Sequence, residues 1–302
     1  MPFPLLGEAA ALLTSVFFSI GPTFFTLAGQ RVGSIIVNRG RLLMAVGMLL
    51  VVHWGLLGSP LPFDAGGDRW FWLGLSGIIG LVIGDAFLFQ AFVMVGTRLT
   101  MLIFSLSPIL SAILAWVFLG ETLRELQILA MLITLAGIAW VVLQSENGDE
   151  SKESKKNYWI GLLFALGGAI SQALGLITAK QGLGGEFSAL SAHLMRISIA
   201  AVVMWGITIL QGKARKTFQT FKQEPLALRE TFLGAIFGPV IGVWFSLVAI
   251  QFTDVGIAST LMALPPVFLL PIGYFVFKEK ITWQAAAGTI VALAGVAILF
   301  LV

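Results

Sequence analysis

The chain has 302 residues, of which 58% are hydrophobic and 11% are charged, and its formal net charge is +3. Soluble domains carry about 25% charged residues, so this composition excludes an ordinary soluble globular protein. The absence of cysteine excludes disulfides, thiolate metal sites and iron–sulfur clusters. The positive charge excess is too small and too scattered to indicate a nucleic-acid-binding surface. We therefore expect an integral, multi-pass, all-α membrane protein with no cofactor and no nucleic-acid partner.

Ten apolar stretches are long enough to cross the ~30 Å hydrocarbon core of a bilayer as helices. In chain order, the expected spans are residues 5–28, 33–57, 70–96, 99–119, 123–143, 158–181, 187–211, 231–252, 255–277 and 282–302. The longest polar stretch, residues 144–157, has mixed charge and little apolar content, which predicts a flexible linker. No basic residue precedes the first apolar run, so we expect a retained helix there rather than a cleaved signal peptide.

The second half of the chain repeats the first. One constant offset matches the halves without a gap over two helices, pairing Pro108 with Pro266, Glu121 with Glu279, Gly137 with Gly295 and, further back, Gly80 with Gly238 and Gly84 with Gly242. The predicted domains are residues 5–143 and 158–302, and five spans per half require the second half to insert inverted. An internal repeat of apolar helices is typical of secondary transporters, whose substrate site lies between the repeats.

Short motifs recur near the end of each half. The motifs are Leu106-Ser107-Pro108, Phe118-Leu119-Gly120-Glu121 and Ala136-Gly137, their echoes Pro265-Pro266, Glu279 and Ala294-Gly295, and the helix-entry arginines Arg41 and Arg196. In these residues the chain resembles the EamA-like branch of the drug/metabolite transporter superfamily, over nearly its whole length. The resemblance implies ten transmembrane helices, arranged as two inverted five-helix repeats around a central cavity. It also implies export of amino acids, metabolites or drugs across a bacterial plasma membrane.

The basic residues predict an orientation in the membrane. If the N-terminus were cytoplasmic, the cytoplasmic loops would hold three lysines and arginines and the opposite loops fourteen. Cytoplasmic loops normally carry the excess of these residues, so the count places both termini outside the cytoplasm. The relatives that the chain resembles generally have both termini in the cytoplasm. Charge and resemblance therefore give opposite expectations for the orientation and direction of transport.

Asp85 is the only acidic residue well inside a predicted span, about 15 residues into the third one. A charged residue at this depth costs ~2.5 to 3.5 kcal/mol, so Asp85 should face a wet cavity or a cation, or carry a proton. The functional interpretation is a proton-coupling carboxylate. The structural interpretation is a cap on a helix broken after Gly84. Val243 holds the equivalent place in the second half, so either role is asymmetric.

Arg41 and Arg196 hold matching places in the second and seventh spans. Asn38 lies three residues before Arg41 and His193 three before Arg196, a spacing that puts each pair on one helical face. In inverted halves the two arginines enter from opposite sides of the membrane. Each guanidinium can pair with Asp85, clamp the carboxylate of an anionic substrate, or extend to lipid phosphates.

Three further polar or aromatic residues are candidates for lining the cavity. Gln90 and Gln172 lie within spans, where an amide either binds substrate or links helices by hydrogen bonds. Trp244, together with Phe245, follows Gly242 and is the aromatic residue expected to reach the cavity.

Charged residues near the ends of the spans have structural interpretations. We expect Arg39 and Lys180 to extend to lipid headgroups. Glu121 and its counterpart Glu279 are expected to cap the next helix or to pair across a short turn.

The leading hypothesis is a secondary transporter of small organic solutes that works by alternating access. The chain has no Walker A motif, so ATP does not drive it directly, and the coupling is either to protons through Asp85 or absent. The alternatives are a lipid flippase or scramblase, which needs a polar groove open to lipid, and an intramembrane enzyme, suggested only by the GxSG motif at Gly74–Gly77. The expected partners are a small-molecule substrate and membrane lipid, and a monomer and a homodimer are both compatible with this architecture.

Overall fold

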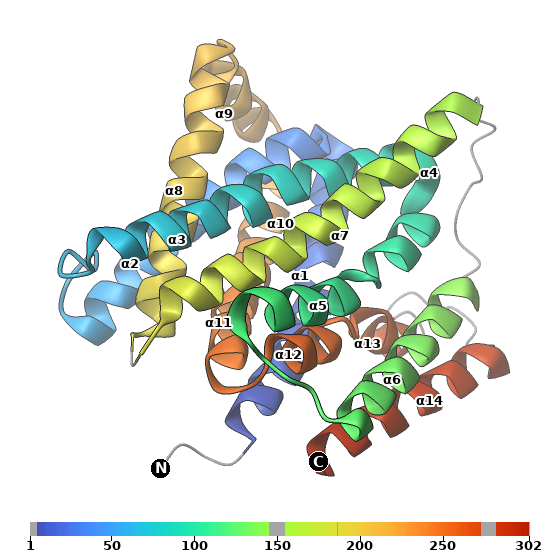
Figure 1. The fold of residues 1–302 in the computed structure, drawn as a ribbon. Coiled ribbons are helices and arrows are strands. Elements are labelled where there is room, and N and C mark those ends of the chain that lie inside the picture. The colour runs from blue at the N-terminus through green and yellow to red at the C-terminus, as the bar shows by residue number, and fades with distance from the viewer. Residues whose placement is uncertain (1–4, 145–154, 186, 273–281, 302) are drawn as a thin grey trace.

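The structure is a computed structural model that describes residues 5–144, 155–185, 187–272 and 282–301. The helices, in chain order (Figure 1), are α1 Leu6–Val32, α2 Ser34–Leu57, α3 Gly67–Gly77, η1 Ile78–Gly84, α4 Asp85–Phe104, α5 Ser107–Leu119, α6 Glu125–Gln144, α7 Lys155–Leu183, α8 Ala189–Leu210, α9 Ala214–Gln223, α10 Pro225–Ala235, η2 Ile236–Gly242, α11 Val243–Phe252, α12 Val255–Met262, α13 Pro265–Ile272 and α14 Trp283–Leu301. Most of the predicted linker, and Glu279, lie outside the described residues.

Eight helices in the described ranges are long and apolar enough to cross a membrane, and Ser107–Leu119 and Val255–Pro271 are shorter apolar helices. The predicted boundary between the third and fourth spans is wrong, because α4 continues through residues 96–99 to Phe104. The equivalent stretch of the second half does break, at Thr253 and Asp254. Asp254 has extended backbone angles and precedes the first residue of α12, whereas Gly96 stands in its place in the first half. A favourable helix-starting residue is thus present in only one half.

The repeated prolines stand at helix starts, although the predicted spans 99–119 and 255–277 include them in their interiors. Pro108 lies in the first turn of α5, after a break at Ser105 and Leu106. In the second half, α13 begins at Pro265. Proline fits a first helical turn because its missing N–H has no intrahelical partner there.

Each half contains one π-helical segment, η1 or η2, inside a longer helix. The offset that pairs Gly84 with Gly242 also pairs the first residue of η1 with that of η2, and it relates the bounds of α3 to those of α10. A π-helical turn changes which side chains share a helical face and is frequent at functional sites. In the first half, the residue that directly follows this turn is Asp85.

The first helix of each half packs against the opposite half. α1 contacts α10, η2 and α11, and α7 contacts α3, η1 and α4. Glycines permit both crossings: a Cβ at Gly21 would lie 2.8 Å from the Gly238 nitrogen, and one at Gly175 would lie 3.3 Å from the Gly80 Cα. Figure 1 shows α7 running alongside α3 and α4. The two halves therefore interlock through helices whose backbones nearly touch.

Corresponding helices from the two halves run in opposite directions where they meet. Trp205 donates to the Arg39 carbonyl, while His53 hydrogen-bonds to Ser191, so α2 and α8 are antiparallel. α6 and α14 are antiparallel as well, because Gly137 packs on Ala292 and Gly288 on Val141, and they lie side by side in Figure 1. This is the geometry that the prediction of two inverted halves requires.

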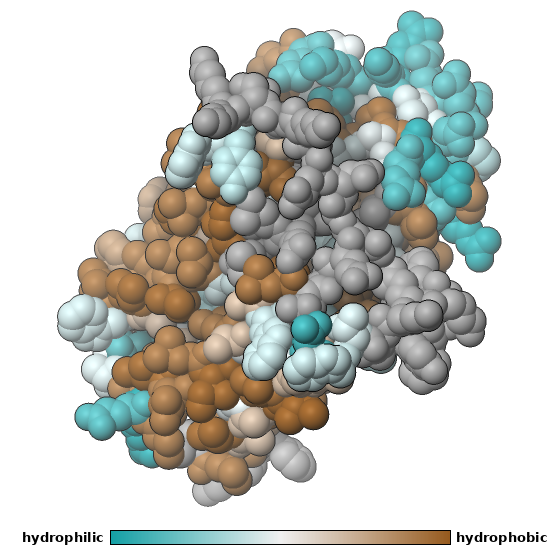
Figure 2. Space-filling view, turned by 90° about the vertical axis from the view of Figure 1, so that its right-hand side faces the viewer, coloured by the Kyte–Doolittle hydropathy of each residue, from teal (hydrophilic) through white to brown (hydrophobic). Residues whose placement is uncertain are grey.

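The outer surface is apolar over a large area. Large hydrophobic side chains such as Trp54, Trp116 and Leu210 are 64%, 64% and 90% exposed. Figure 2 shows one broad apolar face with hydrophilic residues gathered toward its ends. Such a surface would aggregate in water and is suited to contact with lipid tails.

Candidate functional site

Asp85 forms an ion pair with Arg41 inside the helix bundle. The guanidinium of Arg41, two turns into α2, donates to the Asp85 carboxylate at the start of α4. The backbone of Gly84 and Asp85 is helical, so the helix does not break after Gly84. The interpretation of Asp85 as a cap on a broken helix is therefore wrong. Its side chain keeps 20% of its exposure, so the pair is only partly sealed from solvent.

The surroundings of Arg41 hold its guanidinium in place. Its Nε donates to Asn38 Oδ1 at 2.7 Å, as the three-residue spacing in the sequence suggests. The guanidinium carbon lies 5.5 Å from the ring centroid of Phe25 and 5.9 Å from that of Phe89. Two aromatic faces, an amide and a carboxylate therefore fix this cation.

Arg196 approaches the same centre from α8 but has a different environment. It is 3% exposed, and no hydrogen-bond partner for its Nε exists among the described residues. A Cβ at Gly80 would lie 2.8 Å from one of its terminal nitrogens, so the guanidinium occupies a niche that only glycine leaves open. Asp85 lies close enough to Arg196 for the two charges to interact. Arg196 is thus a buried cation whose Nε has no hydrogen-bond partner among the described residues.

His193 does not contact Arg41 or Asp85. Its Nε2 lies within hydrogen-bond distance of the Pro239 carbonyl in η2, so that nitrogen carries the proton and donates. The ring is fully buried, and its Nδ1 has no partner in the described part of the chain. His193 therefore ties α8 to the π-helical segment of the second half, next to Arg196.

The remaining candidates lie outside this cluster of Arg41, Asp85 and Arg196, which we call the central charge cluster. Gln90 is exposed and Gln172 is half-buried, and neither hydrogen-bonds to the cluster within the described residues. Trp244 lines an apolar groove of about 650 Å³ between α2 and the helix formed by α10, η2 and α11. Trp244 is thus close to a groove, but to an apolar one.

A second polar cluster closes the end of the bundle where α1 begins, at the bottom of Figure 1. Lys180 Nζ lies 2.6 Å from Glu121 Oε1 and donates to the Thr253 carbonyl at 2.9 Å. Glu121 Oε2 accepts the Val255 N–H at 2.8 Å, and Thr253 donates to Glu8 at 2.8 Å. These contacts, which we call the end cluster, join Glu8 and Glu121 of the first half to three residues of the second.

Three predictions for charged residues near the ends of the spans are corrected, two of them by the end cluster. Lys180 does not extend to lipid headgroups, because Glu121 is a closer partner in a half-buried site. Arg39 is also buried, at 7% exposure, and donates to Thr217 of α9 at 3.3 Å. Glu121 is a cap as expected, but for α12 of the opposite half rather than for the next helix. Glu121 as the partner of Lys180 and Thr217 as the partner of Arg39 were not predicted, because each pair is far apart in the sequence. The one sequence feature that marked Asp254 is that Gly96 occupies the matching position in the first half.

Asp254 is half-buried beside the end cluster. Its own burial raises the pKa of the Asp254 carboxyl above the ordinary value of 3.8, the Glu121 and Glu8 carboxylates raise it further, and Lys180 opposes them. A raised pKa in the folded state means that the neutral acid is favoured there. This contribution to stability is full at low pH and is lost as pH rises through the raised pKa.

We therefore expect the melting temperature of the purified protein to fall as pH rises above the ordinary aspartate pKa of 3.8, and to fall less in Asp254→Asn. The amide keeps the neutral form at every pH, so this part of the pH dependence disappears. Fluorescence-monitored unfolding in detergent at a series of pH values measures it, with the exposed Asp64→Asn as the matched control. Parallel curves for the wild type and Asp254→Asn would show that this carboxyl does not titrate in the folded protein.

The GxSG motif does not assemble a hydrolase site in the described residues. Ser76 is buried and donates to the Gly175 carbonyl, which links α3 to α7. His53 hydrogen-bonds to the Ser59 carbonyl and to Ser191, away from this serine. Ser76 therefore has a helix-packing contact in place of a general base.

Comparison with known proteins places the whole chain in one family. Residues 5–143 and 159–301 match the EamA-like transporter family. The chain is 22% identical over 191 residues to the uncharacterized transporter YvbV of Bacillus subtilis (strain 168), a match that covers 63% of this chain and 58% of that protein. A solved crystal structure shares the fold, with a TM-score of 0.69, 18% identity, and coverage of 98% of this chain and 95% of the other. The resemblance found in the sequence is confirmed: the chain belongs to the EamA-like transporter family.

Proposed function

We propose that the protein is a secondary transporter of small organic solutes that carry an anionic group, such as amino acids or other carboxylic acids. The observation that carries this proposal is the charge balance of the central charge cluster. It contains two buried guanidinium groups and one carboxylate, and the Nε of Arg196 has no hydrogen-bond partner among the described residues. An uncompensated cation in this setting favours an incoming anion.

The proposed binding mode uses the difference between the two arginines. Asn38, Asp85 and two aromatic rings already hold Arg41. Arg196 forms no ion pair at contact distance within the described residues, so its guanidinium is the group that a substrate carboxylate would engage, with two parallel hydrogen bonds. Asp85 would then respond to the added negative charge by taking up a proton, which would couple transport to the proton gradient.

Alternating access is supported by the way the halves meet. The end cluster joins the two halves at one end by an ion pair and hydrogen bonds. In the first half Gly96 stands at the counterpart of Asp254, so the first half does not repeat this acidic residue. We assign the end cluster as a contact that forms when this end is shut, and that breaks when the halves rock apart.

A lipid flippase or scramblase is less well supported. Such a protein needs a polar path for a headgroup that is open to the bilayer. The lateral groove beside Trp244 is instead lined by methionine, valine, isoleucine, phenylalanine and glycine. Membership of a transporter family likewise favours a transporter over an enzyme.

The test is transport by purified protein in liposomes. Labelled solutes are compared in matched pairs, each a carboxylic acid and its amide, with a pH gradient of either sign and with none. We expect acids to be transported and their amides to be transported at least about tenfold more slowly, because a charge-assisted hydrogen bond contributes ~1.5 to 3 kcal/mol. Transport of amides and acids at equal rates would overturn the anionic specificity, and transport indifferent to pH would overturn the coupling.

A further inference from the structure

α9 is a short amphipathic helix at the end of the bundle opposite to the end cluster. Its exposed basic residues, with those that flank it, are Lys213, Arg215, Lys216, Lys222 and Arg229. Its opposite side carries Phe221, which is 6% exposed and packs on α2, where a Cβ at Gly40 would lie 2.6 Å from the ring. A helix with one basic and one aromatic side lies in the headgroup region of a membrane.

Contacts to the bundle fix α9 in this position. Arg39 of α2 donates to Thr217, and Trp205 of α8 donates to the carbonyl of that same arginine. The Phe218 ring packs on Trp205 with 5.2 Å between the ring centroids. α9 is therefore a built part of the fold, which holds its basic residues in fixed places above α2.

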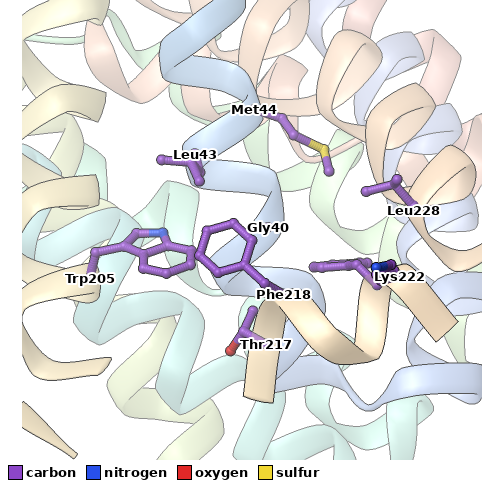
Figure 3. Close-up of a pocket in the computed structure, with 9 residues that line it drawn as sticks. Gly40, Leu43, Met44, Trp205, Thr217, Phe218, Lys222 and Leu228 are labelled. Carbon is purple, nitrogen blue, oxygen red and sulfur yellow. The ribbon is translucent and has the colours of Figure 1, made fainter. Parts of the chain in front are cut away.

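An apolar pocket of about 340 Å³ lies beneath α9. α2, α8, α9 and α10 all line it, chiefly through Gly40, Leu43, Met44, Trp205, Leu228 and Lys222. Figure 3 shows Trp205 and Leu43 on one side of the pocket, and Lys222 and Leu228 on the other. Lys222 is the only cation among the lining residues of this pocket.

The pocket continues into the lateral groove beside Trp244, because Met44 lines both. The α2 residues that line them, from Gly40 to Val52, recur at three- and four-residue intervals and so share one helical face. This face is about 18 Å long at 1.5 Å per residue. One leaflet of a bilayer core is about 15 Å thick, so an extended acyl chain fits along the face.

From this geometry we infer that the groove along α2 binds one acyl chain of an anionic glycerophospholipid, with the lipid phosphate at Lys222. The apolar lining suits the chain, and the basic residues of α9 suit a negatively charged headgroup rather than a zwitterionic one. The site is separate from the central charge cluster, and it ties α2, a helix that carries Arg41, to the surrounding membrane.

Gly47 provides a selective way to block the groove. It lines the groove on α2, and a Cβ placed on it meets no atom within 4 Å, so a leucine there fills the groove without displacing the fold. Gly55 lies on the same helix, also meets nothing within 4 Å, and is not among the groove residues. Gly47→Leu and Gly55→Leu are therefore a matched pair.

The experiment is native mass spectrometry of delipidated protein titrated with phosphatidylglycerol or with phosphatidylcholine of the same chain length. We expect one phosphatidylglycerol to bind more tightly than phosphatidylcholine. Gly47→Leu should weaken this binding at least about tenfold, the effect of removing roughly two buried methylene groups, while Gly55→Leu leaves it unchanged. Lys222→Gln should reduce the preference for phosphatidylglycerol about fivefold, and the exposed Lys216→Gln should reduce it less.

Melting temperatures of all four variants show whether each is folded. Equal phosphatidylglycerol binding by folded Gly47→Leu and by the wild type would overturn the proposal. Competition by soluble glycerol phosphate, which has no acyl chain, would also overturn it, because the site would then recognise phosphate alone. Displacement of the lipid by a transported solute would show that the groove is a path for substrate rather than a lipid site.

Discussion

Asp85→Asn is expected to abolish transport driven by a pH gradient, because the amide keeps the shape of the side chain but cannot bind and release a proton. The structure adds a second effect. The substitution leaves the Arg41 guanidinium without its carboxylate, and removing one partner of a buried ion pair costs about 3 to 5 kcal/mol. We therefore expect Asp85→Asn to have a lower melting temperature as well.

A double variant separates the two effects. In Arg41→Gln/Asp85→Asn neither charge of the pair remains, so stability should recover most of the loss while transport stays absent. Transport assays in liposomes and thermal unfolding in detergent measure the two quantities on the same preparations. If Asp85→Asn transported with unaltered rate and pH dependence, the carboxylate would have a purely structural role and the protein would be an uncoupled facilitator.

The residues of the central charge cluster could be predicted as site candidates from the sequence, because charged residues are rare inside apolar membrane spans. A carboxylate and two arginines inside apolar spans are costly, so each needs a partner or a function. Helical spacing also placed Asn38 beside Arg41 correctly, since both lie on one short segment. What the spacing could not specify was the partner: Asp85 binds Arg41, and Arg196 occupies the glycine niche.

The contacts that the sequence did not reveal all join distant segments. Lys180 and Glu121 are not close in the chain, and they meet only because α7 packs against the first half. The same holds for Arg39 and Thr217. The break between α4 and α5 was misplaced for a local reason, because a glycine in an apolar run is compatible with both a continuous helix and a turn. Pro108 was likewise placed inside the predicted span 99–119, although a proline fits the first turn of a helix, which is where the structure has it.

Lys180→Met is expected to open the end of the bundle where α1 begins. The lysine is the cation that the structure places among Glu8, Glu121 and Asp254, and its removal leaves these carboxylates to repel one another across the contact between the halves. Without this partly buried ion pair, the contact between the two halves loses its main attractive interaction. If the end cluster shuts this end of the transporter, the open state should become more populated.

A single cysteine reports the opening, because the chain has none of its own. Ser15 is fully buried on α1, about 10 Å along the helix from Glu8, and sulfur replaces its hydroxyl oxygen with little change in size. A water-soluble maleimide should label Ser15→Cys at least about tenfold faster when Lys180→Met is also present, a shift in population equivalent to ~1.4 kcal/mol. The exposed Lys216→Met, on α9 at the other end, should leave the rate unchanged. Equal labelling in both backgrounds, with normal transport, would mean that Lys180 and Glu121 only stabilise the fold and that the closing contact lies elsewhere.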